Sequence, residues 1–223
     1  SDVYKRQVLP SVVEAAIKCQ DFGADGVTIH PRPDERHITR KDVYDIKPII
    51  TAEYNIEGYP SVDFIKMVIA VKPEQVTLVP DGPDVITSCA GWDTIKFQDY
   101  LKEIIAEFKE HGIRTSIFVD PKLEMIEGAK LCGTDRVELY TEDYATKYVD
   151  DKEKAIAPYV LVAKKAAELG LGVNAGHDLS LENLAYFAEH IPNLAEVSIG
   201  HALISDALYL GLENTIQMYK RLL

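Results

Sequence analysis

Cysteine is scarce in this 223-residue sequence, and its placement excludes two common uses. Cys19, Cys89 and Cys132 lie far apart, and no Cys-x-x-Cys spacing occurs. Neither a disulfide framework nor a zinc knuckle is indicated, and a reducing cytoplasm is the expected compartment. Positive charge is also short, since 24 Lys and Arg stand against 36 Asp and Glu and the net charge is −12. We therefore expect no general binding to nucleic acid or to anionic membranes, because both need cationic faces.

Long apolar runs and cofactor-binding signatures are missing too. The longest hydrophobic stretches, such as residues 159–163, are far too short to cross a bilayer. No P-loop or dinucleotide fingerprint occurs. No lysine ends a predicted strand as a Schiff-base aldolase requires, because Lys122 is expected to begin a helix. No two candidate metal ligands share the tight spacing common in metal hydrolases, so neither a metal site nor a cofactor is predicted.

The rest of the chain alternates between strand-like and helix-like segments. Hydrophobic runs bounded by turn residues predict seven strands, at residues 27–29, 53–57, 75–79, 114–119, 136–139, 172–174 and 196–199. Apolar residues at helical spacing, with polar caps and glycine stops, predict eight helices, at residues 10–22, 39–50, 61–71, 93–111, 123–132, 152–169, 181–190 and 201–222. A polar segment at residues 140–151 connects the fifth strand to the sixth helix, which Pro158 is expected to kink or split.

Strict alternation of this kind predicts a parallel sheet with right-handed crossovers. A (β/α)8 TIM barrel has about 250 residues, and it fits this chain better than an open doubly wound sheet. The count is one strand short, and the shortfall lies before Pro10. We expect an α/β chain of the TIM-barrel class without strand 1, which the natural protein should begin with. Residues 1–7 are expected to be a non-native or disordered tail ahead of a single domain at residues 8–223.

Histidines concentrate where such a fold keeps its chemistry, just past the carboxyl ends of the strands. His30, His37, His177 and His201 all fall in loops that follow predicted strands. The other two histidines fall in the last turns of predicted helices, where a cationic side chain favours the helix dipole, and both are expected to be structural. A polar loop with satisfied hydrogen bonds is the simpler alternative for the four loop histidines.

Two carboxylates occupy strand ends that are otherwise apolar. Glu57 closes one predicted strand and Glu138 occupies the matching place on another. A carboxylate at that depth is costly unless it is paired or used, so both are candidates for general acid–base chemistry. The alternative is a salt bridge across the barrel mouth to Arg32 or Arg36.

Two glycine turns point to phosphate. Asn174-Ala-Gly-His177 follows one strand, and Ile199-Gly-His-Ala202 leads directly into the last helix. Backbone N–H groups at a helix N-terminus, which glycine leaves open to close approach, form a phosphate cradle. In barrels that cradle usually lies on the loops after the last two strands. Arg32 and His37 could hold a second phosphate, so the predicted substrate is doubly anionic, or there are two phosphorylated substrates.

Six segments taken together resemble the pyridoxine 5′-phosphate synthase family of vitamin B6 biosynthesis. They are GVTIHPRPDERHI, EYNIEGYP, LVPDGPDVITSCAGWD, VELYTEDYA, VNAGHDLSLENL and VSIGHALISDAL, and the match runs from Val8 to Leu223. The resemblance implies a (β/α)8 barrel with extra helices, assembled as a homo-octamer, that uses no metal or organic cofactor. It implies condensation of 3-amino-2-oxopropyl phosphate with 1-deoxy-D-xylulose 5-phosphate, with release of inorganic phosphate and water.

The resemblance also assigns roles to residues. It implies that His30 and Glu57 are general bases, that His177 is the proton donor and that Glu138 stabilises charge during ring closure. The expected substrate-binding residues are Arg32, His37 and Thr87 for the deoxyxylulose phosphate, Gly200 and His201 for the amino ketone phosphate, and Asp178 beside the donor histidine.

One departure from the family pattern stands at the start of the chain. The family begins with a strand that carries an asparagine and an Asp-His pair, and residues 1–7 do not match it. We expect the chain as given to be poorly active for that reason. Two other readings stay open: a different phosphosugar isomerase or epimerase on a TIM barrel, and a non-catalytic barrel that binds phosphate.

Overall fold

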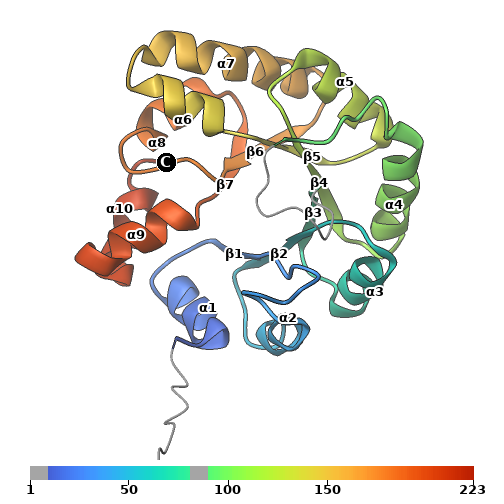
Figure 1. Cartoon of the computed structure of the whole chain (residues 1–223), viewed down its shortest axis with the longest axis vertical. Helices are drawn as coiled ribbons and strands as arrows, with labels where there is room; N and C mark the ends of the chain where they lie inside the picture. Colours follow the sequence, from blue (N-terminus) through green and yellow to red (C-terminus); the bar gives the residue numbers. More distant parts are fainter. Residues whose placement is uncertain (1–9, 81–89) are drawn as a thin grey trace, which may run out of the picture.

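The computed structural model describes residues 10–80 and 90–223. In them, seven parallel strands form one sheet in the order β1 to β7. The sheet curls into a nearly closed barrel with the helices outside it (Figure 1). The strands are β1 (Gly26–Ile29), β2 (Glu53–Gly58), β3 (Gln75–Leu78), β4 (Arg114–Val119), β5 (Arg136–Leu139), β6 (Gly172–Gly176) and β7 (Leu194–Ser198). The predicted fold class and the seven strands are confirmed, and the expected tail lies outside the described residues.

Ten helices surround the strands in the described part of the chain, two more than predicted. They are α1 (Val12–Asp21), α2 (Arg40–Ile46), α3 (Val62–Val71), α4 (Gln98–Glu110), α5 (Leu123–Cys132), α6 (Glu142–Tyr148), α7 (Lys152–Glu168), α8 (Leu184–His190), α9 (His201–Leu210) and α10 (Leu212–Lys220). None of these helices is both long and apolar enough to span a membrane.

Several of the predicted helices differ in detail from the observed ones. A single helix over residues 201–222 is wrong, because Gly211 adopts a φ of 79° and separates α9 from α10. Helix α4 begins five residues later than predicted, since the Asp93 carboxylate accepts the N–H groups of Ile95 and Lys96 and forms a turn first. Helix α7 runs through Pro158 without a break.

Helix α6 occupies the segment that was predicted to be a polar connection. Tyr144 is fully buried, and its ring packs edge-on against Tyr159 and Phe187, with ring centroids 5.8 and 5.0 Å away. Its hydroxyl donates a hydrogen bond of 2.7 Å to the Asn183 carbonyl oxygen on the neighbouring segment. Contacts from distant parts of the chain therefore stabilise α6, and local sequence pattern does not reveal them.

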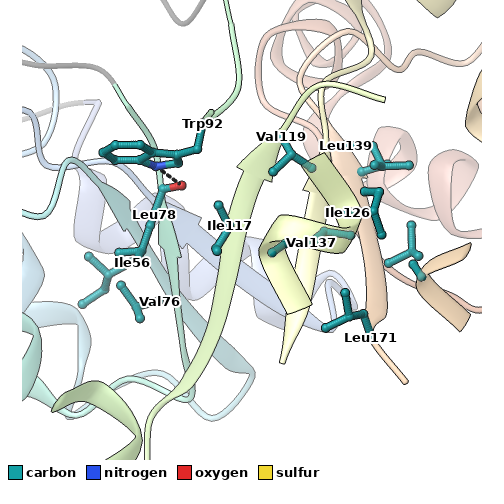
Figure 2. Packing of buried hydrophobic residues seen from close by; sticks show 14 of the residues in the cluster. Ile56, Val76, Leu78, Trp92, Ile117, Val119, Ile126, Val137, Leu139 and Leu171 are labelled. Carbon is teal, nitrogen blue, oxygen red and sulfur yellow. Dashed lines mark hydrogen bonds between the residues drawn. The ribbon is translucent and has the colours of Figure 1, made fainter. Parts of the chain in front are cut away.

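Side chains alternate between the two faces of the strands. Leu78, Ile117 and Val137 lie on the face that packs against the helices, in the apolar layer drawn in Figure 2. The indole nitrogen of Trp92 donates a hydrogen bond of 3.1 Å to the Leu78 carbonyl oxygen and closes this layer near the end of β3 (Figure 2). The alternate positions, such as Gln75, Thr77 and Glu138, point inward, so the inside of the barrel is largely polar, with Phe118 as an apolar exception.

The lower layer of the barrel interior is a charged network that we call the polar floor. It consists of Glu53, Gln75, Arg114, Arg136, Asn174 and Glu196. Four of these residues open their strands, so the floor lies at the amino-terminal end of the barrel. Gln75 on β3 donates to Glu196 on β7 at 3.3 Å, and these two strands are far apart in the sheet. Such a bond has to cross the interior.

A second layer lies above the floor and joins the two edges of the sheet. The hydroxyls of Thr28 on β1 and Ser198 on β7 are 3.1 Å apart. The Asn55 amide donates to Thr28 at 3.3 Å and to Thr77 at 3.1 Å. We call these four residues the hydroxyl–amide belt. In the described part of the chain, the Ser116 hydroxyl is the one buried side-chain polar group without a hydrogen-bond partner.

Tyr144 provides a test of the packing that stabilises α6. Replacing Tyr144 by Ala removes a fully buried ring, so we expect the free energy of unfolding to fall by about 3–5 kcal/mol. Tyr144→Phe keeps the ring and removes one of the two donors to the Asn183 carbonyl, which still accepts from the Phe187 N–H at 3.2 Å, so the cost should be only about 0.5–1.5 kcal/mol. Urea denaturation measures both values. Tyr44→Ala is the matched control, because Tyr44 on α2 is 49% exposed, and a loss comparable to that of Tyr144→Ala would contradict the interpretation.

Candidate active site

His30 and Glu57 form a direct pair at the carboxyl ends of two neighbouring strands. His30 follows β1 and Glu57 is the penultimate residue of β2, and these strands pair in parallel with Ile29 opposite Ile56. The His30 Nδ1 and Glu57 Oε1 atoms lie 3.2 Å apart, and the two side chains are 24% and 21% exposed. Glu57 therefore contacts a histidine, whereas Arg36, one of its expected alternatives, pairs with Asp34 at 2.6 Å.

Glu138 lies deeper in the barrel than this pair. It is the third residue of β5 and is only 4% exposed. Burial raises the pKa of the Glu138 carboxyl well above its ordinary value, and the carboxylates of Glu57 and Glu196 raise it further. A hydrogen bond from Thr77 opposes this shift only in part. Glu138 is thus a buried carboxyl group that favours its neutral form.

His177 stands at a strained turn directly after β6. Its φ of 56° lies in the left-handed region, which is uncommon for a residue with a side chain. The turn is fixed from two sides, because the His177 N–H donates to the Ser198 carbonyl at 3.1 Å and the Thr141 hydroxyl donates to the Gly176 carbonyl. Gly176 is required here, since a Cβ atom at that position would lie 2.2 Å from the Ser198 carbonyl oxygen.

Asp178 contacts the ring of the histidine that precedes it. Its Oδ2 atom is 3.0 Å from His177 Nδ1, while the His177 side chain remains 52% exposed. The ring of Tyr140 lies edge-on to the imidazole at 6.1 Å. The carboxylate and the aromatic ring therefore orient the imidazole and leave Nε2 as the nitrogen that can meet a ligand. The sequence predicts Asp178 as a substrate-binding residue beside His177, but it gives no sign of the contact between the two side chains.

The Gly200 turn leads into helix α9 and is open to a ligand. Gly200 is the N-cap residue, with a φ of −108° that any residue can adopt, and a Cβ atom there would meet no atom of the described residues within 4 Å. Neither the backbone conformation nor packing against the described part of the chain requires a glycine. His201, the first residue of α9, is exposed beside it. The freed N–H groups and the helix dipole suit an anion at this position.

The remaining predicted substrate-binding residues lie on loops. Arg32 is half-buried and His37 is exposed on the loop between β1 and α2. Thr87 lies outside the described residues. A hollow of about 560 Å³, lined by α1 and the α9–α10 turn, contains none of the predicted site residues.

One set of interior residues escaped the sequence prediction. The inner face near Glu138 also carries Arg136, Glu196 and Thr77. The sequence pattern does not distinguish these residues from ordinary strand positions. Their only signal is the alternation itself, since each is a polar residue on the face that points into the barrel. No group of three or more His, Cys, Asp or Glu side chains in the described segments is placed to hold a metal ion.

Sequence comparison identifies relatives over almost the whole chain. Residues 4–223 match the family described as "Pyridoxal phosphate biosynthesis protein PdxJ". A pyridoxine 5′-phosphate synthase of Bacteroides fragilis (strain YCH46) is 63% identical over 215 residues, which cover 96% of this chain and 91% of that protein. The synthase of Flavobacterium johnsoniae is 62% identical over 211 residues, which cover 95% and 89%.

Structural comparison finds the same fold in distant proteins. A phosphoribosyl anthranilate isomerase from Thermotoga maritima superposes with a TM-score of 0.62 at 15% identity, covering 94% of this chain and 92% of that one. A thiamine phosphate pyrophosphorylase from Pyrococcus furiosus gives a TM-score of 0.63 at 12% identity, covering 96% and 90%. At such identities the likeness shows the fold alone.

The raised pKa of Glu138 predicts a pH dependence of stability. The folded chain keeps the Glu138 proton at pH values where the unfolded chain has released it, so the free energy of unfolding should fall as pH rises. The fall begins near the ordinary carboxyl pKa of about 4.3, with a limiting slope of about 1.4 kcal/mol per pH unit. Urea denaturation between pH 5 and 8 should show that Glu138→Gln lacks this decline and gains stability over the wild type as pH increases.

Asp135 provides a control of opposite sign. Burial alone would raise the pKa of the Asp135 carboxyl. Hydrogen bonds from Lys109 and Thr115 outweigh burial and lower this pKa below its ordinary value. Asp135→Asn should therefore be less stable than the wild type at neutral pH, and the difference should shrink as pH falls below the ordinary carboxyl pKa. If Glu138→Gln and Asp135→Asn showed the same pH trend, the assignment of a neutral Glu138 would be wrong.

Proposed function

Because the chain belongs to the PdxJ family of pyridoxal phosphate biosynthesis proteins and functions as a pyridoxine 5′-phosphate synthase, we propose that the His30–Glu57 pair is its general base. The substrates of such a synthase are small phosphorylated molecules. We propose 3-amino-2-oxopropyl phosphate and 1-deoxy-D-xylulose 5-phosphate, joined and closed to a ring with loss of phosphate and water. Imine formation, dehydration and elimination all proceed through proton transfers, which paired histidine and glutamate groups can carry out.

The contact between His30 and Glu57 carries this proposal. With Nδ1 held 3.2 Å from the carboxylate, His30 Nε2 is left to remove a proton from substrate, and the carboxylate stabilises the imidazolium that forms. The pair lies at the carboxyl ends of β1 and β2, the face on which barrel enzymes bind their substrates. It is also only partly exposed, so water competes weakly with a bound substrate.

His177 would act as the proton donor from the other side of the mouth. Its Nδ1 contacts Asp178, and its own N–H is fixed to β7, so Nε2 has a defined position. Asp178 would thereby serve as an orienting partner as well as a substrate neighbour. Glu138, beneath the mouth, would stabilise the charge that develops as the ring closes.

Two phosphate positions follow from the turns and loops. Gly200 and His201, at the N-terminus of α9, would bind the amino ketone phosphate through backbone N–H groups and the imidazole. Arg32 and His37, on the loop after β1, would bind the deoxyxylulose phosphate together with Thr87. Two such positions suit two substrates that each carry one phosphate.

The surface of α9 supports the homo-octamer implied by the family resemblance. Ile204, Leu208, Tyr209 and Leu210 are exposed along this helix, which has no buried residue. Apolar side chains gathered on one helix usually mark a contact between proteins. We propose that copies of this chain contact each other there, in an assembly of the cytoplasm, and sedimentation equilibrium measures its size.

The general-base pair can be tested by removing one proton acceptor at a time. Glu57→Gln keeps the size of the side chain but removes the carboxylate, and His30→Gln removes the base, so we expect each to lower kcat by about 10²-fold or more. The double variant should lose little beyond either single variant, because the two groups act as one unit. Steady-state kinetics with both substrates measures this.

Glu53→Gln is the matched control for Glu57→Gln. Glu53 lies four residues earlier on the same strand, at the opposite end of the barrel, and pairs with Arg114. Turnover of Glu53→Gln should stay within a few-fold of the wild type. Omission of either substrate should abolish turnover, which separates a synthase from a phosphosugar isomerase or epimerase. Unchanged turnover in Glu57→Gln would contradict the proposed base.

Gly200 tests the phosphate cradle separately from the chemistry. Gly200→Ala adds a methyl group that meets no atom of the described residues and fits the observed backbone, so stability should be unchanged. We expect the KM for the amino ketone phosphate to rise by about 10- to 100-fold, the equivalent of one hydrogen bond to a charged group. Gly176→Ala should instead lower stability, because its methyl group would strike the Ser198 carbonyl. Wild-type KM in Gly200→Ala would refute this position for the phosphate.

A further inference from the structure

Glu138 lies buried beside an arginine that is bound to another carboxylate. Arg136 is two residues earlier on β5 and therefore points to the same inner face. Its Nη1 atom donates to Glu196 Oε2 at 2.9 Å and to Asn174 Oδ1 at 3.3 Å. The ion pair lies in the polar floor, below Glu138. Arg136, the arginine nearest to Glu138 along β5, therefore binds Glu196 and Asn174.

A bulge at the start of β7 places the Glu196 side chain in the polar floor. The register between β6 and β7 shifts so that Val173 pairs with Leu194 and Asn174 with Glu196, which leaves Ala195 as the extra residue of a bulge. A bulge turns the following side chain to the other face, and here it brings Glu196 inward. Gln75 and Asn174 also donate to the Glu196 carboxylate, at 3.3 and 3.4 Å. Three donors from three strands therefore fix its position.

Charged groups approach Glu138 from several strands. Among the described residues, Glu57 on β2 and Glu196 on β7 act on it directly. His30, at the end of β1, is bound to Glu57, and Arg136 lies two positions earlier on the inner face of β5. The uncharged groups are Thr77 on β3, Ser116 and Phe118 on β4, and Asn174 on β6. Arg114, the other arginine of the floor, contacts Glu53 and Gln75.

We propose that Glu196 is a positioning residue of the synthase, which holds Arg136 in the floor and so keeps Glu138 a neutral acid able to donate a hydrogen bond to the substrate. Without Glu196, the nearest strong partner for the guanidinium would be Glu138, and a charge-assisted pair would fix that carboxyl in its ionised form. An ionised carboxylate only accepts hydrogen bonds, so it could not stabilise an oxygen on which negative charge develops. The use made of the neutral acid rests on the proposed function, whereas the charge arrangement does not.

The protonation of Glu138 can be followed directly by infrared difference spectroscopy during a pH titration. A buried carboxylic acid gives a C=O stretching band of its own, and Glu138→Gln identifies that band by removing it. In the wild type the band should be present at pH 7. In Glu196→Gln its titration midpoint should fall by at least one pH unit, because a negative neighbour is lost and a guanidinium is released.

Three further variants separate this inference from a general change of charge or structure. Glu53→Gln removes the same charge from the other floor pair and should leave the midpoint unchanged. Glu196→Asp, which keeps the charge, should retain most of the wild-type behaviour. The double variant Arg136→Met with Glu196→Gln removes the released cation. Its titration midpoint should return most of the way to the wild-type value.

Kinetics then connects the charge arrangement to the reaction. The alkaline limb of the kcat profile should move to lower pH in Glu196→Gln by the same amount as the infrared midpoint, with KM little changed. A wild-type infrared midpoint in Glu196→Gln, or a similar fall in Glu53→Gln, would overturn the inference. An infrared shift with no change in the kcat profile would instead overturn the role proposed for Glu138 in catalysis and leave the charge arrangement standing.

Discussion

Hydrogen bonding inside the barrel is the constraint on which the rest of this structure depends. A parallel sheet that curls on itself has one face toward helices and one toward a narrow interior. In this chain the outer face is apolar and the inner one carries Asn, Thr, Gln, Arg and Glu. Buried polar groups are costly unless they are satisfied. The polar floor and the hydroxyl–amide belt meet this demand with bonds that cross from strand to strand, and these bonds also set the distances between strands.

The polar interior connects the amino-terminal end of the barrel, where the polar floor lies, to the carboxyl end, where the His30–Glu57 pair lies. Glu138 lies between the His30–Glu57 pair above and the Arg136–Glu196 pair below, and it interacts with a carboxylate of each. A barrel filled with branched aliphatic residues would insulate the mouth from the floor. Here, charges at the floor reach the mouth through a low-dielectric interior, where electrostatic effects are strong. Residues remote from substrate can therefore influence proton transfer.

Much of the fold could be predicted from local signals, and the errors have identifiable causes. Helix α3 begins and ends as expected, because Ser61 caps it and Lys72 leaves it in the left-handed region. Helix α6 was missed because the tyrosine that anchors it is buried by residues distant in sequence. The break at Gly211 was missed because the apolar pattern continues past it. In the site, strand ends pointed to His30, Glu57, Glu138, His177 and the Gly200 turn. The pairing of His177 with Asp178 and the inward turn of Glu196 depend on a strained residue and a bulge, and neither has a sequence signature.

The hydrogen bond between His177 and Ser198 joins the turn after β6 to the turn after β7. Ser198 precedes Gly200 by two residues, so main-chain atoms connect the His177 turn to the Gly200 turn, without a flexible side chain between them. Gly176 permits this contact by leaving room for the carbonyl. In the proposed binding mode, this connection fixes the distance between the site for the anionic group and the site for the reacting carbon, so a compound one atom longer or shorter could not be accommodated by moving either turn alone.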